Sequence, residues 1–251
     1  MSSRKIRADE LVVMIGLAES RTQAQKLILA GQVMFPGGMI LDKPSRELEV
    51  GTKLQIRYFP RYVGRGGEKL EGFFQCHSVE LSNCCALDIG ASTGGFTDYL
   101  LQHGIASVSC VDVGHGQLHY KLRIDPRVSN FEGVNARRLA EVALPHSSYD
   151  IIVIDVSFIS LTKILPSAWK FLKENGLLVA LVKPQFEAAL EEVSRGRGVI
   201  LDENIHRRVC REIRNFSSEN LTGCQIVAEV PSPISGADGN REFFIGMRKK
   251  L

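Results

Sequence analysis

The sequence predicts an α/β protein with a doubly wound, mostly parallel sheet whose last strand is antiparallel, preceded by a small α+β domain. From Val79 onward, short apolar runs alternate with amphipathic segments, the pattern of strands and helices in such a sheet. One of these runs ends in Asp88 and leads through a glycine-rich turn into a helix-like segment. The region before Phe59 carries two short helical patterns followed by short β-like runs, which indicates a separate small domain.

The first domain is expected to contain two helices and several short strands. Arg7–Leu17 has apolar residues at helical spacing, and Ser20–Gln23 is a capping-box pattern that begins a helix over Arg21–Ala30, with Gly31 as its end. Short β-like runs follow at 32–35, 39–41 and 54–58. A stretch with one proline and three glycines at 60–67 is the expected linker between residues 1–59 and residues 68–251.

The second domain is expected to hold five parallel strands and a closing β pair. We expect parallel strands over 84–87, 107–112, 128–131, 149–155 and 176–183, and helices over 68–74, 96–103, 135–142, 161–172 and 202–216. Pro184 favours an extended Lys183 and opens a charged loop over 184–198, within which 188–193 has a helical pattern. The closing strands are expected over 224–230 and 242–248.

The composition is that of a soluble globular protein. The 251 residues are 44% hydrophobic and 24% charged, and no apolar run approaches the ~18 residues needed to span a bilayer. The N-terminus is charged and lacks the apolar segment of a signal peptide, and the six cysteines form no Cys-x-x-Cys pair. We therefore expect a reduced, cytoplasmic protein without structural zinc and without stable insertion into a membrane.

The charge is unevenly distributed along the chain. Residues 1–70 contain 12 Lys and Arg against 7 Asp and Glu, whereas the remainder contains 19 against 21. A basic N-terminal region on a near-neutral body favours a polyanionic partner such as nucleic acid. An ordinary solvated surface would give a similar excess.

Charged residues follow several of the expected parallel strands. Asp88, Asp112, Asp155 and Lys183 stand at strand ends, and Glu242 opens the final strand. Because the carboxyl ends of parallel strands meet at one edge of the sheet, these side chains are expected to share a crevice. A buried charge costs several kcal/mol unless it is paired. The cluster therefore indicates a functional site. The alternative is a salt-bridge network, and Asp112 could instead cap the helix that follows it.

The glycine-rich turn predicts a ligand bound close to the backbone. Its spacing, Gly-x-x-x-Gly-Gly, differs from the dinucleotide fingerprint and from the P-loop. A carboxylate just before the turn suits an amine rather than a phosphate, and an acid after the second strand suits ribose hydroxyls. A ligand such as S-adenosylmethionine fits both. The cofactor-binding candidates are Asp88, Gly90, Ala91, Ser92, Thr93, Gly94, Gly95, Asp112, Asn135 and Asp155.

Other candidate sites are weaker. His115 and His119 stand four residues apart, but Gly116 weakens a helix there and no third ligand is evident, so no metal site is expected. Ser157 lies near Asp155 without the Gly-x-Ser-x-Gly elbow of a nucleophilic serine. Lys69 falls in the first turn of a helix, where it is either an accidental surface residue or directed at a phosphate.

The N-terminal domain resembles the small RNA-binding domain named after the fourth small-subunit ribosomal protein. The match covers roughly residues 5–58, in the pattern Arg-x-Asp-x-Leu-Val followed by Gly-Leu-Ala-x-Ser-Arg-x-x-Ala-x-x-Leu-Ile-x-x-Gly-x-Val. The resemblance implies that Arg21, Gln25 and Lys26 contact an RNA backbone, and such contacts position RNA without reading its sequence. Helix residues that only face solvent would give the same sequence pattern. Further RNA-binding candidates are Arg4, Arg7, Lys43 and Arg65.

Nearly the whole chain resembles the TlyA-type proteins, which join this small domain to an FtsJ-like methyltransferase and often carry the label hemolysin. The matching stretches are Tyr62–Lys69, Asp88–Thr97, Val111–Leu118, Asp125–Val128, Asn135–Arg138, Asp155–Leu161 and Leu181–Glu187. The resemblance implies a methyltransferase version of the expected fold. It also implies 2′-O-methylation of ribosomal RNA, free or in a ribosomal subunit, with S-adenosylmethionine.

The resemblance also implies a catalytic tetrad. The family's Lys-Asp-Lys-Glu set falls on Lys69, Asp155, Lys183 and Glu242. Lys183 would take the proton of the ribose 2′-hydroxyl as general base, and Asp155 would orient it. Lys69 and Glu242 would place the substrate ribose.

Two features depart from the family, and three other functions compete. The helical pattern at 188–193 replaces an early glycine and a short glycine-rich loop, and Tyr62 stands where some members have Trp. The alternatives are a membrane-active hemolysin and an RNA-binding protein with an inactive methyltransferase domain. A nicotinamide dehydrogenase is disfavoured by the glycine spacing.

Overall fold

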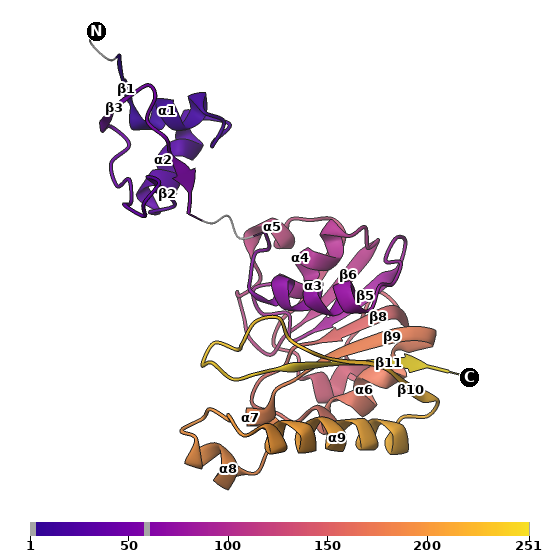
Figure 1. Cartoon of the computed structure of the whole chain (residues 1–251). Helices are drawn as coiled ribbons and strands as arrows, with labels where there is room; N and C mark the ends of the chain where they lie inside the picture. Colours follow the sequence, from indigo (N-terminus) through magenta and orange to yellow (C-terminus); the bar gives the residue numbers. More distant parts are fainter. Residues whose placement is uncertain (1–3, 58–60, 251) are drawn as a thin grey trace. The chain divides into compact units, whose positions relative to one another are not determined.

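The chain folds into two compact units. The computed structural model describes residues 4–57 and 61–250, and the units divide between residues 60 and 61 (Figure 1). Within these described ranges, no helix combines the length and the apolar character that crossing a membrane requires.

The small unit packs two helices against short strand pairs. Its elements are β1 (Lys5–Arg7), α1 (Ala8–Met14), α2 (Arg21–Leu29), β2 (Val33–Met34), β3 (Glu47–Glu49) and β4 (Gln55–Ile56). The strands pair antiparallel, β1 with β3 and β2 with β4. The apolar faces of both helices meet in a core that includes Leu11, Ile28 and Leu41.

The sequence predicts α2 closely and the strands of the small unit less well. The Ser20 hydroxyl caps α2 by accepting the Gln23 N–H, whereas the Gln23 side chain accepts the N–H of Glu19 rather than that of Ser20. Strands β1 and β3 were not expected, because three-residue charged strands carry no clear alternation. The expected strand at 39–41 is only an isolated bridge between Ile40 and Met34.

The large unit is a seven-stranded sheet covered by helices on both faces. The strands are β5 (Cys85–Ile89), β6 (Ser107–Val111), β7 (Val128–Phe131), β8 (Tyr149–Ile154), β9 (Leu172–Val182), β10 (Cys224–Pro231) and β11 (Phe243–Lys249). Their order is β10-β11-β9-β8-β5-β6-β7, with β5 to β9 parallel and β11 antiparallel to both neighbours. The predicted doubly wound sheet is therefore confirmed.

Two apolar cores lie on opposite faces of this sheet. The helices of one face are α3 (Gly66–Cys76) and α4 (Gly95–Gln102), and those of the other are α6 (Leu165–Lys170) and α9 (Glu203–Asn220) (Figure 1). Phe73 and Leu100 belong to the first core, Trp169 and Val209 to the second. Buried β8 presents residues to both cores, which explains its continuous apolar run.

Several connections differ from the expectation. The helix expected over 161–172 is split into the 3₁₀ turn η2 (Leu161–Lys163) and α6, with Pro166 in the first turn of α6. The helix expected over 135–142 is the 3₁₀ segment η1 (Ala136–Glu141). The short α5 (Tyr120–Arg123) was not predicted, and the loop expected over 184–198 contains α7 (Pro184–Glu187) and α8 (Leu190–Arg195).

Residues 61–67 pack on the large unit instead of forming a free linker. Tyr62 is 3% exposed and joins the core beneath α3 and α4. The backbone N–H of Val63 donates to Asp98 on α4 at 2.8 Å. Gly67 already belongs to α3, and a Cβ there would lie 2.2 Å from the Tyr62 ring. Pro60, the first residue of the expected linker, lies outside the described residues.

Candidate active site

Three strand ends and helix α3 bring four charged side chains to one edge of the sheet. Asp155 follows β8 directly, and Lys183 follows β9 with the extended backbone that Pro184 favours. Strand β11 runs antiparallel to β9, with Phe243 opposite Val182, so Glu242 arrives at the end where Lys183 leaves. Lys69 comes from the first turns of α3. The register of β11 therefore explains how a residue far along the chain joins this edge.

The four residues form two ion pairs, of which Lys69–Glu242 is buried and Lys183–Asp155 is partly buried. Lys69 Nζ lies 2.6 Å from Glu242 Oε2, and both side chains are almost fully buried. Lys183 Nζ lies 2.6 Å from Asp155 Oδ1 and donates a hydrogen bond to Ser157 Oγ at 3.0 Å. Removing either partner of the Lys69–Glu242 pair leaves an uncompensated buried charge, which is strongly destabilising. Each lysine thus has a defined carboxylate that fixes its position.

All four side chains line one cavity of about 600 Å³, here called the Lys183 cavity. Its wall also includes the glycine-rich turn after β5, the N-terminus of α3 and the connection between β10 and β11. Arg65 closes part of this wall, because its guanidinium donates to the carbonyl oxygen of Ser235. The cavity is large enough for a small substrate group beside a second ligand.

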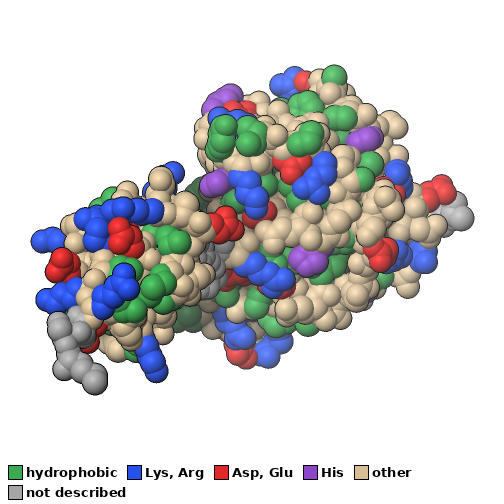
Figure 2. Space-filling view, turned by 90° about the horizontal axis from the view of Figure 1, so that it is seen from above, with side chains coloured by type: hydrophobic (Ala, Val, Ile, Leu, Met, Phe, Trp, Pro, Cys, Tyr) green, Lys and Arg blue, Asp and Glu red, His purple; other side chains and the backbone are tan. Residues whose placement is uncertain are grey.

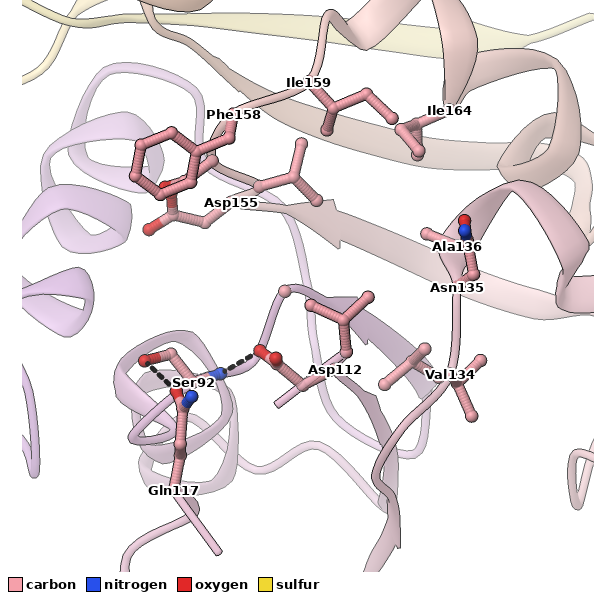
Figure 3. A pocket seen from close by; sticks show the side chains of 15 residues that line it. Ser92, Asp112, Gln117, Val134, Asn135, Ala136, Asp155, Phe158, Ile159 and Ile164 are labelled. Carbon is pink, nitrogen blue, oxygen red and sulfur yellow. Dashed lines mark hydrogen bonds between the residues drawn. The ribbon is translucent and has the colours of Figure 1, made fainter. Parts of the chain in front are cut away.

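A second cavity of about 400 Å³, the Asp112 cavity, lies beside it (Figure 3). Asp112 accepts the N–H of Ser92 at 2.8 Å and that of Gly114 at 2.7 Å. The remaining wall is largely apolar and includes Ile159 and Ile164. The two cavities form one cleft, since they share Gly90, Ser92, Asp155, Ser157 and Phe158.

Asp88 lies at the base of the Lys183 cavity and is fully buried. The Thr97 hydroxyl donates to its Oδ2 at 2.7 Å, while Oδ1 has no partner among the described residues. Burial raises the pKa of Asp88 to about 7, and the nearby carboxylates of Asp155 and Asp112 act in the same direction. A buried acceptor without a donor is costly, so this oxygen is suited to a cationic or hydrogen-bond-donating ligand.

Glycine is required at two positions of the turn for different reasons. Gly90 has φ +83°, and a Cβ there would lie 2.3 Å from the carbonyl oxygen of Asp155. Gly94 has φ +94° and abuts Leu122 rather than lining either cavity. Of the turn residues predicted to bind a cofactor, Gly94 alone lies away from both cavities in the described structure. Asn135 lines the Asp112 cavity and also caps η1 through the Arg137 N–H.

The structure adds aromatic residues that the sequence analysis did not single out. Phe158 is 89% exposed, has φ +64°, and lines both cavities. Its ring lies 4.9 Å from that of Phe186, and Lys183 Nζ lies over the Phe186 ring at 5.8 Å. Strain of this kind at a cleft mouth is typical of functional positions. The available signal was a pair of apolar residues, Phe158 and Ile159, between two serines in the loop after β8.

Glu187 connects the two loops that follow β8 and β9. Its Oε1 accepts the N–H of Leu161 at 2.7 Å, and burial raises the pKa of the Glu187 carboxyl. The segment carrying Lys183 is therefore tied to the segment carrying Asp155. Sequence spacing alone gave no sign of this contact.

The RNA-binding candidates of the small unit surround a buried acid. Asp9 is fully buried and accepts hydrogen bonds from Arg7, Arg21 and Gln25 at 2.8–3.0 Å. The exposed candidates of this unit include Arg4, Lys26 and Lys43. On the face seen in Figure 2, Lys and Arg side chains of the small unit lie around a few acidic ones. Arg65 belongs to the large unit.

No group of His, Cys, Asp and Glu suited to a metal ion occurs among the residues that the structure describes. His115 lies 3.9 Å from Glu132, on the exposed surface. His119 instead caps α5 by accepting the Lys121 N–H.

Comparison with known proteins gives one consistent family. Residues 62–249 match the FtsJ-like methyltransferase family. Hemolysin A of Brachyspira hyodysenteriae is 42% identical, covering 95% of this chain and 98% of the relative. The 16S/23S rRNA (cytidine-2'-O)-methyltransferase TlyA of Mycobacterium tuberculosis is 38% identical, covering 98% and 91%.

Solved structures agree with this family and with its fold. A Streptococcus thermophilus protein named as a hemolysin is 40% identical, with a TM-score of 0.74 over 99% of this chain and 90% of its own. A magnesium protoporphyrin IX methyltransferase of Synechocystis, solved with bound SAH, is 13% identical and has a TM-score of 0.52 over 74% of this chain and 83% of its own. That second likeness shows the fold alone.

Proposed function

This chain belongs to the FtsJ-like methyltransferase family, and from that premise we propose that it methylates a ribose 2′-hydroxyl of ribosomal RNA, using S-adenosylmethionine. One observation carries the proposal. Two lysine–carboxylate pairs, Lys69 with Glu242 and Lys183 with Asp155, line a single cavity that opens into a second one. This reaction needs a proton acceptor, a place for the substrate ribose and a neighbouring site large enough for a nucleoside.

The cleft residues fit S-adenosylmethionine by their chemistry. The unpartnered Oδ1 of Asp88 suits an ammonium group, and Asp112 with Asn135 suits ribose hydroxyls and a base edge. The apolar wall around Ile159 and Ile164 suits an adenine ring. When bound, S-adenosylmethionine supplies a methyl group on a positively charged sulfur.

Lys183 is the proposed general base. In its neutral form Nζ would take the proton of the 2′-hydroxyl, so that the O–H bond would break as the oxygen bonds to the methyl carbon. The bond from that carbon to the donor's sulfur would break in the same step, and its electron pair would leave the sulfur as a neutral thioether. Asp155 Oδ1 at 2.6 Å and Ser157 Oγ at 3.0 Å hold Nζ in place for this transfer and stabilise the resulting ammonium. The Lys69–Glu242 pair positions the substrate ribose through the remaining donors of the Lys69 ammonium and lone pairs of the carboxylate.

The small unit is proposed to hold the RNA while the large unit acts on it. Its surface combines exposed cations with two arginines fixed by Asp9, an arrangement suited to phosphates. The Mycobacterium tuberculosis relative is named a 16S/23S rRNA (cytidine-2'-O)-methyltransferase, which supports cytidine in rRNA as the target. An enzyme with that substrate works in the cytoplasm.

The test is mass spectrometry of rRNA nucleosides from cells with and without the gene. We expect a 2′-O-methylated nucleoside that disappears with the gene and returns with the wild-type protein but not with Lys183→Ala. Calorimetry should give S-adenosylmethionine affinity for Lys183→Ala within about tenfold of wild type, because Lys183 acts on the proton. Lys170→Ala, an exposed lysine on α6, is the matched control and should retain full activity.

Two results would contradict the proposal. Unchanged nucleosides together with no heat from S-adenosylmethionine would favour an inactive RNA-binding module. Leakage of liposomes, equal for wild type and Lys183→Ala, would favour the membrane-active alternative.

A further inference from the structure

The connection between β10 and β11, residues 232–242, carries Glu242 into the Lys183 cavity and is held from two sides. On the α3 side, Lys69 pairs with Glu242 and Arg65 donates to the Ser235 carbonyl. On the α9 side, the connection is held by buried Asn240, which lines neither cavity, and by the exposed ion pair of Arg241 with Glu203. The second attachment has no place in the mechanism above.

Asn240 is a buried side chain that links two segments distant in sequence. It is 1% exposed, its Nδ2 donates to the Gly198 carbonyl at 2.9 Å, and its Oδ1 accepts the Ile200 N–H at 2.9 Å. The Ile200 carbonyl in turn accepts the Nε2–H of buried His206 on α9 at 2.9 Å. The connection is thereby fixed to the start of α9 through a chain of buried hydrogen bonds.

The same residue shapes the turn that faces Glu242. The Asn240 carbonyl accepts the Gly236 N–H at 2.8 Å, which closes the turn between them. A Cβ at Gly236 would lie 2.6 Å from Glu242 Oε1, so the turn packs directly against that carboxylate. Displacing Asn240 therefore moves the wall against which Glu242 rests.

We infer that Asn240 is a positioning residue for Glu242, and through it for Lys69, during methyl transfer. The inference rests on the proposed function. A hydrogen-bonded amide can fix a neighbouring loop in both directions, because it donates and accepts at once. Losing both bonds removes the buried attachment of residues 236–242 to residues 198–200 and leaves the exposed Arg241–Glu203 ion pair as their contact with α9. The predicted defect lies in turnover, because among the described residues neither Asp88 nor a residue lining the Asp112 cavity hydrogen-bonds to this connection.

The test is a double-mutant cycle of Asn240→Ala and Glu242→Gln, measured as turnover and S-adenosylmethionine affinity. We expect Asn240→Ala to lower kcat by about 10- to 100-fold, as misplacement of a reacting group does, with affinity within about twofold of wild type. In the Glu242→Gln background the same replacement should add less than about twofold, because coupled residues are not additive. Ser217→Ala, which removes another buried hydrogen bond, to Ile213 on α9, is the control and should leave kcat unchanged.

Asn240→Asp separates positioning from loss of stability. Its carboxylate would oppose the Gly198 carbonyl at high pH, whereas its protonated form can donate as the amide does. Its kcat relative to wild type should therefore rise as pH falls. The inference would be overturned by a ratio of variant to wild-type kcat that does not change with pH, or by additive losses in the double-mutant cycle. It would also be overturned by a loss of kcat equal to that of Ser217→Ala when the two variants are equally stable.

A crystal structure of Asn240→Ala gives a readout that does not depend on activity. A Lys69 Nζ to Glu242 Oε2 distance lengthened beyond 4 Å supports the inference, and an unchanged 2.6 Å overturns it. This result stands even if the wild-type protein methylates no rRNA, in which case the proposed function fails separately.

Discussion

Replacing Asp88 with Asn should stabilise the unliganded protein at alkaline pH while weakening S-adenosylmethionine binding. The pKa of Asp88 is raised from 3.8 to about 7 by burial, so the folded state holds a proton that the unfolded state releases. Between about pH 4 and pH 7 the free energy of unfolding therefore falls as pH rises. About 3 pKa units at about 1.4 kcal/mol each give a cost of roughly 4 kcal/mol above pH 7.

The Asp88→Asn variant removes this loss of stability and keeps the hydrogen bond from Thr97. The Thr97 hydroxyl, which donates to Asp88 Oδ2 at 2.7 Å, can donate to the amide oxygen instead. Urea unfolding should then give a variant that equals wild type near pH 4 and exceeds it by up to about 4 kcal/mol at pH 8. Calorimetry should show loss of affinity for S-adenosylmethionine, because the carboxylate proposed to meet the ammonium is gone. Wild-type affinity should fall as pH drops below about 7, because Asp88 is then protonated.

Asp150→Asn provides a control of opposite sign. The pKa of Asp150 is lowered: burial works to raise it, but the Cys85 N–H and Lys173 outweigh that effect. Asp150→Asn should therefore cost more stability at pH 8 than near pH 3. A stability difference for Asp88→Asn that stays constant from pH 5 to pH 8 would refute the reasoning, and so would unchanged ligand affinity.

Three further predictions concern the turn, the cleft mouth and the small unit. Gly90→Ala should lose ligand binding by calorimetry and lower the free energy of unfolding, with about 1–3 kcal/mol from its positive φ alone and more from the clash with Asp155. Phe158→Ala should change stability by less than about 0.5 kcal/mol, since the ring is exposed, yet raise KM for rRNA in kinetic assays by the loss of about 1–3 kcal/mol of base stacking. Asp9→Asn should weaken rRNA binding in filter assays and destabilise the small unit by about 1–3 kcal/mol, because Arg21 loses its carboxylate partner; full rRNA affinity would contradict this.

The sequence predicted the sheet well because most of its strands are encoded by local runs of apolar residues. Strand β8 is mostly a continuous apolar run, as is the second half of β9, and the ends of β7, β8 and β9 fall within a few residues of the expectation. The position of Lys183 followed from the apolar run that it ends and from Pro184 after it. By contrast, α5 is too short to show a periodicity, and η1 carries a helical pattern in a 3₁₀ geometry.

The side-chain partners of the candidate site could be predicted only in part. Asp155 and Lys183 follow adjacent parallel strands, so their proximity is a property of the sheet. The pairing of Lys69 with Glu242 depends on the register of antiparallel β11, which no local pattern encodes. The strand pattern had placed Glu242 in the charged cluster and left Lys69 undecided, and resemblance to a family supplied their roles. The exposed Phe158 depends on a left-handed backbone that sequence does not reveal.

The antiparallel strand β11 has a consequence for how the enzyme matures on the ribosome. It lies between β9 and β10, yet it is translated after the other six strands of the sheet. Domains generally begin to fold from the N-terminus during synthesis. A nascent chain can therefore assemble the glycine-rich turn and Lys183 well before Glu242 emerges, so it would acquire the ability to hold a donor molecule earlier than the ability to use it.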